Sequence, residues 1–203
     1  MCGIIGIASN KPVSMNIINS LKKLEYRGYD SAGLATLNNN EINEKKCSGR
    51  VEELEKILFK TPSDGHLGIG HVRWATHGIP NVLNAHPHSS EIVSVVHNGI
   101  IENAMELSDI VKDLCYGLSS ETDTELIVHL MHHELKKVNE EAEYLSAFSS
   151  VISMLKGSWA IALMISGFDG ILVSRQGAPL VIGRGHDNIS IASDIQPFYG
   201  ACS

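Results

Sequence analysis

The spacing of apolar residues divides the chain into strand-like and helix-like segments that come in blocks. Short apolar or alternating runs predict strands, in chain order, at residues 3–9, 32–37, a segment entering Cys47, 67–73, 92–97, 158–166, 170–175, 179–183 and 189–193. Apolar positions three and four residues apart predict helices from Ser14 through Leu24, from Ser48 to Lys60, and over about 102–115, 122–137 and 141–155. Because helices and strands do not alternate one for one, we expect a layered α+β domain rather than a doubly wound sheet.

Three local signals set the ends of these segments. Ser14 is a natural N-cap for the first helix, and Thr122 with Glu125 has the spacing of a capping box. The run at residues 38–40 is all asparagine, which tolerates positive φ and therefore predicts a hairpin turn between two strands.

Composition narrows the class of protein. The chain has 203 residues, of which 43% are hydrophobic and 19% charged, which is typical of one globular domain. The net charge of −7 is spread without basic clusters, which argues against a nucleic-acid surface or a polybasic membrane patch. No apolar stretch is long enough to span a membrane, and the start lacks the basic region of a secretory signal, so we expect a cytoplasmic protein.

The first candidate for chemistry is Cys2. If Met1 is removed, one residue carries both a thiol and a free α-amine, whose ordinary pKa of about 7.7–8.0 lets it act as the base for the thiol. The alternative is a small apolar cysteine in a strand. The other cysteines are Cys47, Cys115 and Cys202, and none forms a Cys-x-x-Cys pair, so we expect free thiols.

Two further segments follow predicted strands. Arg73 could bind a carboxylate with its guanidinium, helped by the Thr76 hydroxyl, or it could simply form a surface ion pair beside a half-buried Trp74. The Asn98 amide beside the Gly99 N–H offers two donors to a developing oxyanion, although the same dipeptide is also typical of a turn.

Acidic and histidine-rich segments complete the candidates. Asp123 could hold a substrate ammonium, or it could cap a helix start, where the helix dipole favours its ionised form. His86 and His88, and His129 with His132 and His133, raise the possibility of a metal, but no third ligand has the spacing of a zinc site. We predict no metal.

Six segments taken together resemble a known family. They are Cys2-Gly3-Ile4 and residues 24–33, 71–78, 84–88, 96–103 and 120–125, in register from residue 2 to about residue 194. They resemble the glutaminase domain, a class II glutamine amidotransferase, of glucosamine-6-phosphate synthase, also called glutamine–fructose-6-phosphate aminotransferase (isomerising). Cys2-Gly3-Ile4 alone would indicate only the wider class II amidotransferases.

The resemblance implies a fold, a reaction and residue roles. The fold is an N-terminal-nucleophile hydrolase sandwich of four αββα layers, with two antiparallel sheets between helices. The reaction hydrolyses L-glutamine to glutamate and ammonia, and the ammonia passes to fructose 6-phosphate. Carried over onto matching positions, the implied nucleophile is Cys2 and the implied oxyanion hole is Asn98 with Gly99. The implied glutamine-binding residues are Arg73, Trp74, Thr76, His77 and Asp123, and Arg27 is implied to lie near the cysteine.

The resemblance also sets the expected extent of the protein. We expect residues 1–203 to be a type 2 glutamine amidotransferase domain that stops before the family's glutaminase half ends, without sugar-isomerase domains, and the full-length enzyme to be a homodimer. No cofactor is expected. Two rival functions stay open: a non-catalytic glutamine-binding fragment, and the glutaminase of an amidophosphoribosyltransferase-like enzyme.

Overall fold

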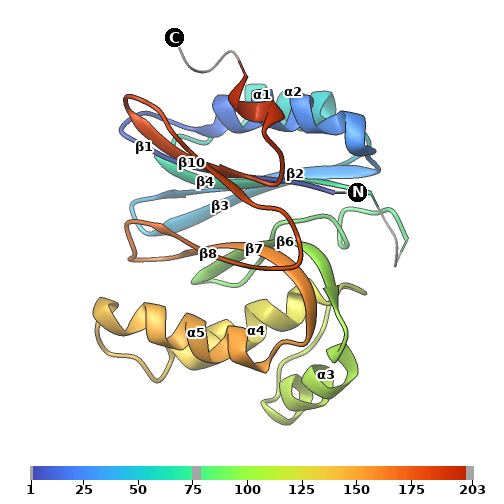
Figure 1. Ribbon diagram of the computed structural model, residues 1–203, viewed down its shortest axis with the longest axis vertical. Helices are drawn as coiled ribbons and strands as arrows, with labels where there is room; N and C mark the ends of the chain where they lie inside the picture. The colour runs from blue at the N-terminus through green and yellow to red at the C-terminus, as the bar shows by residue number, and fades with distance from the viewer. Residues whose placement is uncertain (1, 75–78, 200–203) are drawn as a thin grey trace.

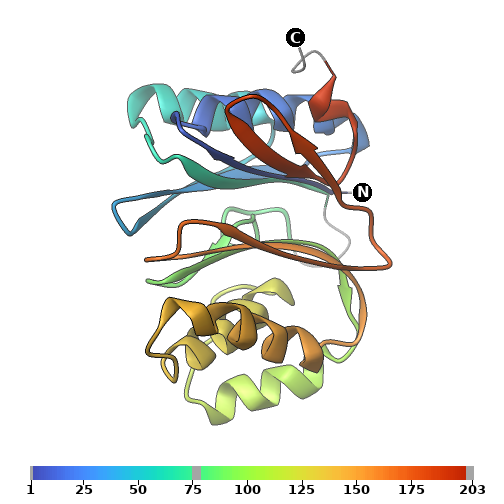
Figure 2. The same ribbon diagram turned by 60° about the vertical axis from the view of Figure 1, so that its left-hand side comes forward.

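Four layers of secondary structure make up the protein in the computed structural model, which describes residues 2–74 and 79–199. Helices α1 (Ser14–Leu24) and α2 (Val51–Lys60) form one outer layer, and α3 (Ala104–Asp113), α4 (Thr124–Leu135) and α5 (Tyr144–Met154) form the other. Two sheets lie between them (Figures 1 and 2). This arrangement confirms the predicted α+β class and the αββα layering.

The first sheet has six strands in the order β3-β2-β4-β1-β10-β9. Their bounds are β1 Gly3–Ser9, β2 Ser31–Asn38, β3 Glu41–Ser48, β4 Leu67–Arg73, β9 Val181–Arg184 and β10 Asn188–Ala192. The second sheet has the order β5-β6-β7-β8, with β5 at His88–Ser89, β6 at Val93–Ile101, β7 at Gly157–Ile165 and β8 at Ile171–Gln176. Neighbouring strands within both sheets pair antiparallel. Short 3-10 turns occupy Glu25–Arg27, Glu141–Glu143 and Gln196–Phe198.

Apolar side chains fill the three interfaces between the layers. Successive strand residues point to opposite faces, so Ile5 packs with α1 and α2 while Ile4 packs between the sheets. A third cluster joins the second sheet to α3, α4 and α5. Burial on both faces explains why β1 and β7 are almost continuously apolar in sequence, and why β4 is apolar as far as His71.

The predicted hairpin is confirmed, and several predicted ends are wrong. Asn39 and Asn40 have φ of 48° and 66° between β2 and β3. Ser14 is the first residue of α1, whose N-cap is Val13 without a side-chain cap. Helix α2 begins at Val51, three residues later than predicted. The Val51 N–H donates to Glu25 Oε1 at 2.7 Å. A carboxylate distant in sequence thus replaces the local cap.

The capping box predicted at Thr122 and Glu125 is also wrong. Helix α4 begins at Thr124 with no side-chain cap. The Glu125 carboxylate instead accepts hydrogen bonds from the backbone N–H groups of Ser119 and Ser120, at 2.8 and 2.7 Å, and from their hydroxyls. Burial raises the pKa of Glu125, but these donors outweigh it and lower the pKa to about 2.

The largest departure concerns Asn98 and Gly99. The sequence alone allowed a turn there, yet β6 continues through both residues to Ile101, with Asn98 opposite Ala160 and Gly99 opposite Trp159. Gly99 has φ of +130°, and a β-carbon built on it would lie 2.0 Å from Ser158 O. Only glycine fits this conformation at this distance from the neighbouring strand.

No helix among the described residues is both long and apolar enough to cross a membrane.

Candidate active site

Cys2 lies immediately before β1, where its thiol meets the end of β4. The antiparallel register pairs Gly3 with Val72, which places Cys2 opposite Arg73 and next to Trp74. The Trp74 N–H donates to Cys2 Sγ at 3.3 Å, and the thiol lies 3.5 Å from Trp74 O. Burial raises the pKa of the Cys2 thiol, although the Trp74 hydrogen bond opposes the shift. A thiol in this position needs a base to become a nucleophile.

Asn98 reaches the same point from the other sheet. Its Nδ2 donates to the Cys2 carbonyl oxygen at 3.2 Å. On the far side of the amide, Asn98 Oδ1 lies 3.0 Å from Nε2 of His71, a residue that we did not predict as part of the site. The amide therefore directs its N–H groups toward the cysteine, as an oxyanion donor requires.

A cavity of about 470 Å³ opens beside these residues. Cys2, Arg73, Gly99 and Asp123 line it together with Ser120, Glu121 and Thr122. Apolar side chains of Ile100, Met105 and Leu118 line the part nearer α3. The volume is sufficient for a free amino acid, and the lining includes both charged and apolar side chains.

Arg73 supplies the positive charge of the cavity. Its side chain is only 5% exposed, and its Nη1 lies 3.7 Å from Asp30 Oδ1. The backbone holds the pair as well, because the Asp30 N–H donates to Arg73 O at 2.7 Å. Sequence reasoning gave Asp30 no role, since a carboxylate 43 positions away becomes Arg73's neighbour only through the pairing of β2 with β4.

Asp123 supplies negative charge to the cavity, which Glu121 also lines. Its Oδ2 accepts the Ile101 N–H at 2.9 Å, and its Oδ1 lies 3.5 Å from His97 Nδ1. Burial raises the pKa of Asp123, but the hydrogen bonds from His97 and Ile101 outweigh it, so the pKa lies below its usual range. The carboxylate is ionised as predicted, and its named partners lie on β6.

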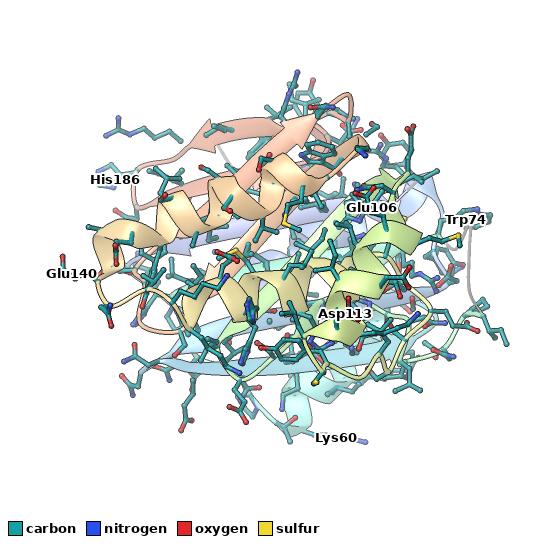
Figure 3. The ribbon with its side chains drawn as sticks, turned by 90° about the horizontal axis from the view of Figure 1, so that it is seen from below. Lys60, Trp74, Glu106, Asp113, Glu140 and His186 are labelled. Atoms are coloured by element: carbon teal, nitrogen blue, oxygen red, sulfur yellow. The ribbon has the colours of Figure 1, made fainter. Side chains whose placement is uncertain are left out.

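Trp74 lies at the rim of the site. Its side chain is half exposed, and Figure 3 places it at the periphery of the molecule, seen from the side of α3, α4 and α5. The ring packs over Gly28, where an added β-carbon would lie 2.3 Å from Trp74 Cε3. Thr76 and His77, which we predicted to help bind the substrate, lie outside the described residues.

Arg27 occupies a different place from the cavity-lining residues. Its Nη1 donates to Ser193 O at 3.0 Å and lies 3.5 Å from Asp194 Oδ2. The Ser193 hydroxyl accepts hydrogen bonds from both the Ile4 N–H and Arg27 Nη1. Through this hydroxyl, Arg27 is connected to β1 at a point two residues after Cys2. Arg27 thus holds the segment after β10 against the start of β1. A contact with substrate stays a prediction.

Of the histidines that raised a metal question, His86 and His88 are buried, whereas those on α4 are partly exposed. No group of three or more metal-ligating side chains in residues 2–74 and 79–199 is arranged to hold an ion. Burial is the largest cause that lowers the pKa of His71 and His88 to about 3 and that of His86 well below its usual range. On α4, the ring of His129 stacks on Tyr116 with centroids 5.0 Å apart. Cys47 and Cys115 are free thiols, as expected.

Comparison with known proteins decides the family. The sequence model of the family described as "Glutamine amidotransferase domain" matches residues 71–200. The chain belongs to this family. The amidotransferase domain is also 46% identical over 196 residues to glutamine–fructose-6-phosphate aminotransferase (isomerising) of Mesorhizobium japonicum, covering 96% of the chain and 32% of that protein. The enzyme of the same name from Pseudomonas putida is 47% identical over 197 residues, with the same coverage.

Solved structures agree on the fold. Glutamine phosphoribosylpyrophosphate amidotransferase from B. subtilis has a TM-score of 0.81 at 25% identity. The match covers 97% of this chain and 43% of the B. subtilis chain. A structure described as the allosteric regulatory enzyme of purine biosynthesis has a TM-score of 0.83 at 26% identity, with the same coverage. The amidotransferase domain therefore has the N-terminal-nucleophile fold that the resemblance implied. It spans about a third of the length of the curated relatives it matches.

Proposed function

We propose that this domain hydrolyses L-glutamine to glutamate and ammonia with Cys2 as the nucleophile. The observation that carries the proposal is that Cys2, Arg73 and Asp123 line one cavity, with the Asn98 amide hydrogen-bonded to Cys2 beside it. Arg73 suits the α-carboxylate of a free amino acid and Asp123 suits its α-ammonium. With both ends held, the side-chain amide of glutamine points toward Cys2.

The reaction then proceeds in two steps. Once Met1 is removed, the Cys2 α-amine takes the thiol proton and the sulfur bonds to the glutamine amide carbon. The carbonyl oxygen becomes an oxyanion, which accepts hydrogen bonds from Asn98 Nδ2 and the Gly99 N–H. The carbon–nitrogen bond breaks, ammonia leaves with a proton from the ammonium of Cys2, and a thioester remains. Water attacks the thioester, which releases glutamate and restores the thiol.

In the relatives the matching domain is about a third of a longer protein, and the acceptor of the ammonia in such a protein is a separate proposal. We propose fructose 6-phosphate, aminated to glucosamine 6-phosphate, because the relatives at 46–47% identity carry that aminotransferase name. The phosphoribosylpyrophosphate amidotransferase likeness, at 25% identity, keeps the rival acceptor open. Competition between fructose 6-phosphate and phosphoribosyl pyrophosphate in the full-length context separates the two. A cytoplasmic location and a homodimer stay predictions.

The test starts from intact mass, which shows whether Met1 is gone. The processed chain is then incubated with glutamine, and also with an electrophilic glutamine analogue that alkylates nucleophilic cysteines. Glutamate release, with one adduct that excess glutamine blocks and that Cys2→Ser abolishes, supports the proposal. A processed chain that binds glutamine but releases no glutamate would show a non-catalytic glutamine-binding fragment and overturn it.

A further inference from the structure

His71 lies directly behind the side chain of Asn98, the proposed oxyanion donor. It is 1% exposed and sits on β4, on the face that looks toward the second sheet, since Ile69 on the same face packs between the sheets. Its Nε2 lies 3.0 Å from Asn98 Oδ1 and 3.1 Å from the backbone carbonyl of His97. One ring nitrogen therefore faces two oxygens of β6.

These neighbours determine where the ring carries its hydrogen. A backbone carbonyl oxygen only accepts, and Asn98 presents its oxygen to His71 because its Nδ2 donates to Cys2 O. Nε2 must therefore carry the hydrogen. Burial lowers the pKa of His71 to about 3, so the ring is neutral and this N–H is its only one. Nδ1 is buried and has no hydrogen-bond partner among the described residues.

Packing holds the ring in this orientation. The His86 ring stacks on His71 with centroids 4.3 Å apart and planes 23° apart. His86 is held in turn by Thr124 Oγ1, 2.7 Å from its Nε2. A buried ring stacked against a second buried ring cannot turn its N–H away from Asn98 without displacing that neighbour.

We propose that His71 is a positioning residue of the glutaminase reaction, whose Nε2–H fixes the Asn98 amide with its N–H groups toward Cys2. The inference rests on the proposed function above. Without this donor the amide could rotate and present oxygen to the developing oxyanion, which would repel rather than stabilise it. His71 touches neither the thiol nor the substrate in this scheme, and it acts only through Asn98.

Two substitutions separate the hydrogen bond from the bulk of the ring. In His71→Gln the amide nitrogen sits as many bonds from the backbone as Nε2, whereas in His71→Asn it sits where Nδ1 was. We expect His71→Asn to lower kcat for glutamate release by about tenfold to a hundredfold, the cost of misplacing a reacting group, with KM for glutamine changed by less than about twofold. His71→Gln should recover most of that kcat.

The readouts also exclude a merely structural role. In an Asn98→Ala background, His71→Asn should lower kcat no further, because the group it positions is gone. Ser63→Ala serves as the control, since it removes a buried hydrogen bond to Thr36 remote from the cavity and should lower the melting temperature without lowering kcat. Equal kcat for the Asn and Gln variants, or an undiminished effect of His71→Asn in the Asn98→Ala background, overturns the proposal.

A spectroscopic measurement keeps this inference separable from the proposed function. Wild-type chain lacking Met1 that releases no glutamate overturns the function but leaves the His71 geometry testable. Nitrogen-15 spectra of the ring should show the hydrogen on Nε2 in the neutral form, and His71→Asn should speed exchange of the Asn98 side-chain amide protons. A hydrogen on Nδ1 overturns the inference whatever the activity.

Discussion

Asn98 Nδ2 donates to the carbonyl oxygen of Cys2 at 3.2 Å, although the two residues are 96 positions apart and belong to different sheets. The contact joins the residue just before β1, a strand of the six-stranded sheet, to β6 of the four-stranded sheet. The geometry that positions the thiol and the geometry that positions the oxyanion donor are therefore set by the same packing of one sheet on the other.

Asn98→Ala should remove one oxyanion donor while the cavity stays intact. Losing such a donor typically costs about 3–4 kcal/mol, so kcat should fall roughly a hundred- to a thousandfold with little change in KM. Steady-state glutamate release by processed chain measures both constants. Equal losses in glutamine binding and in turnover would contradict the assignment of Asn98 to the oxyanion.

Asp123→Asn should weaken glutamine binding, since the shape and the hydrogen bond from Ile101 are kept but the negative charge is removed. The loss of a charged hydrogen bond to the ammonium should raise KM by about tenfold to a hundredfold, with a smaller change in kcat. Isothermal titration of glutamine onto a Cys2→Ser background measures affinity without turnover.

The wild-type pH dependence of binding provides a second check on Asp123. Its pKa lies below the usual range, so the carboxylate should stay ionised as the pH falls to the ordinary carboxyl pKa of about 3.9. Glutamine affinity should therefore begin to decline at a lower pH than it would for a carboxylate of ordinary pKa. A decline of affinity that begins near pH 5 would show that Asp123 does not hold the ammonium.

Glu125→Gln should destabilise the fold, although Glu125 does not line the cavity. Four donors from Ser119 and Ser120 surround the carboxylate, and the variant replaces an acceptor oxygen with a donating amide, which should cost about 1–3 kcal/mol. The folded pKa of about 2 lies below the reference 4.5, so the wild-type stabilisation is complete above 4.5 and is lost as the pH falls toward 2. Urea unfolding at pH 7 and at pH 3 should show the difference between the two proteins shrinking at the lower pH.

Gly99→Ala should be far more damaging than an alanine at another glycine with positive φ. The added methyl would lie 2.0 Å from Ser158 O on β7, so either β6 separates from β7 or the chain fails to fold. We expect a loss of more than about 3 kcal/mol. Gly49→Ala is the matched control, since φ is +89° there with no atom within 4 Å of the new methyl, and it should cost only about 1–2 kcal/mol. Similar melting temperatures for the two variants would contradict the role of the close contact.

The apolar periodicity by itself determined the order and type of most elements. Burial on one face or both leaves a local pattern, so β1 and β4 were predicted with the bounds that the structure gives them. The short motifs around Cys2, Arg73 and Asn98 also sufficed for the family, which the family model confirms. Strand parity could have shown more, since Cys2 shares a face with Ile4, and His71 and Arg73 share a face with Ile69.

Tertiary structure alone decided the contacts that connect these segments. A histidine in a strand looks the same in sequence whether it holds a metal, packs in the core or orients an amide, and only the packing of β4 against β6 placed His71 behind Asn98. The path of β6 through Gly99 depended on pairing with β7, and the partners of Glu125 depended on where the preceding loop returned. Hydrophobic pattern is a local property that sequence records, whereas the partner of a buried polar group is fixed by distant segments that meet only when the layers pack.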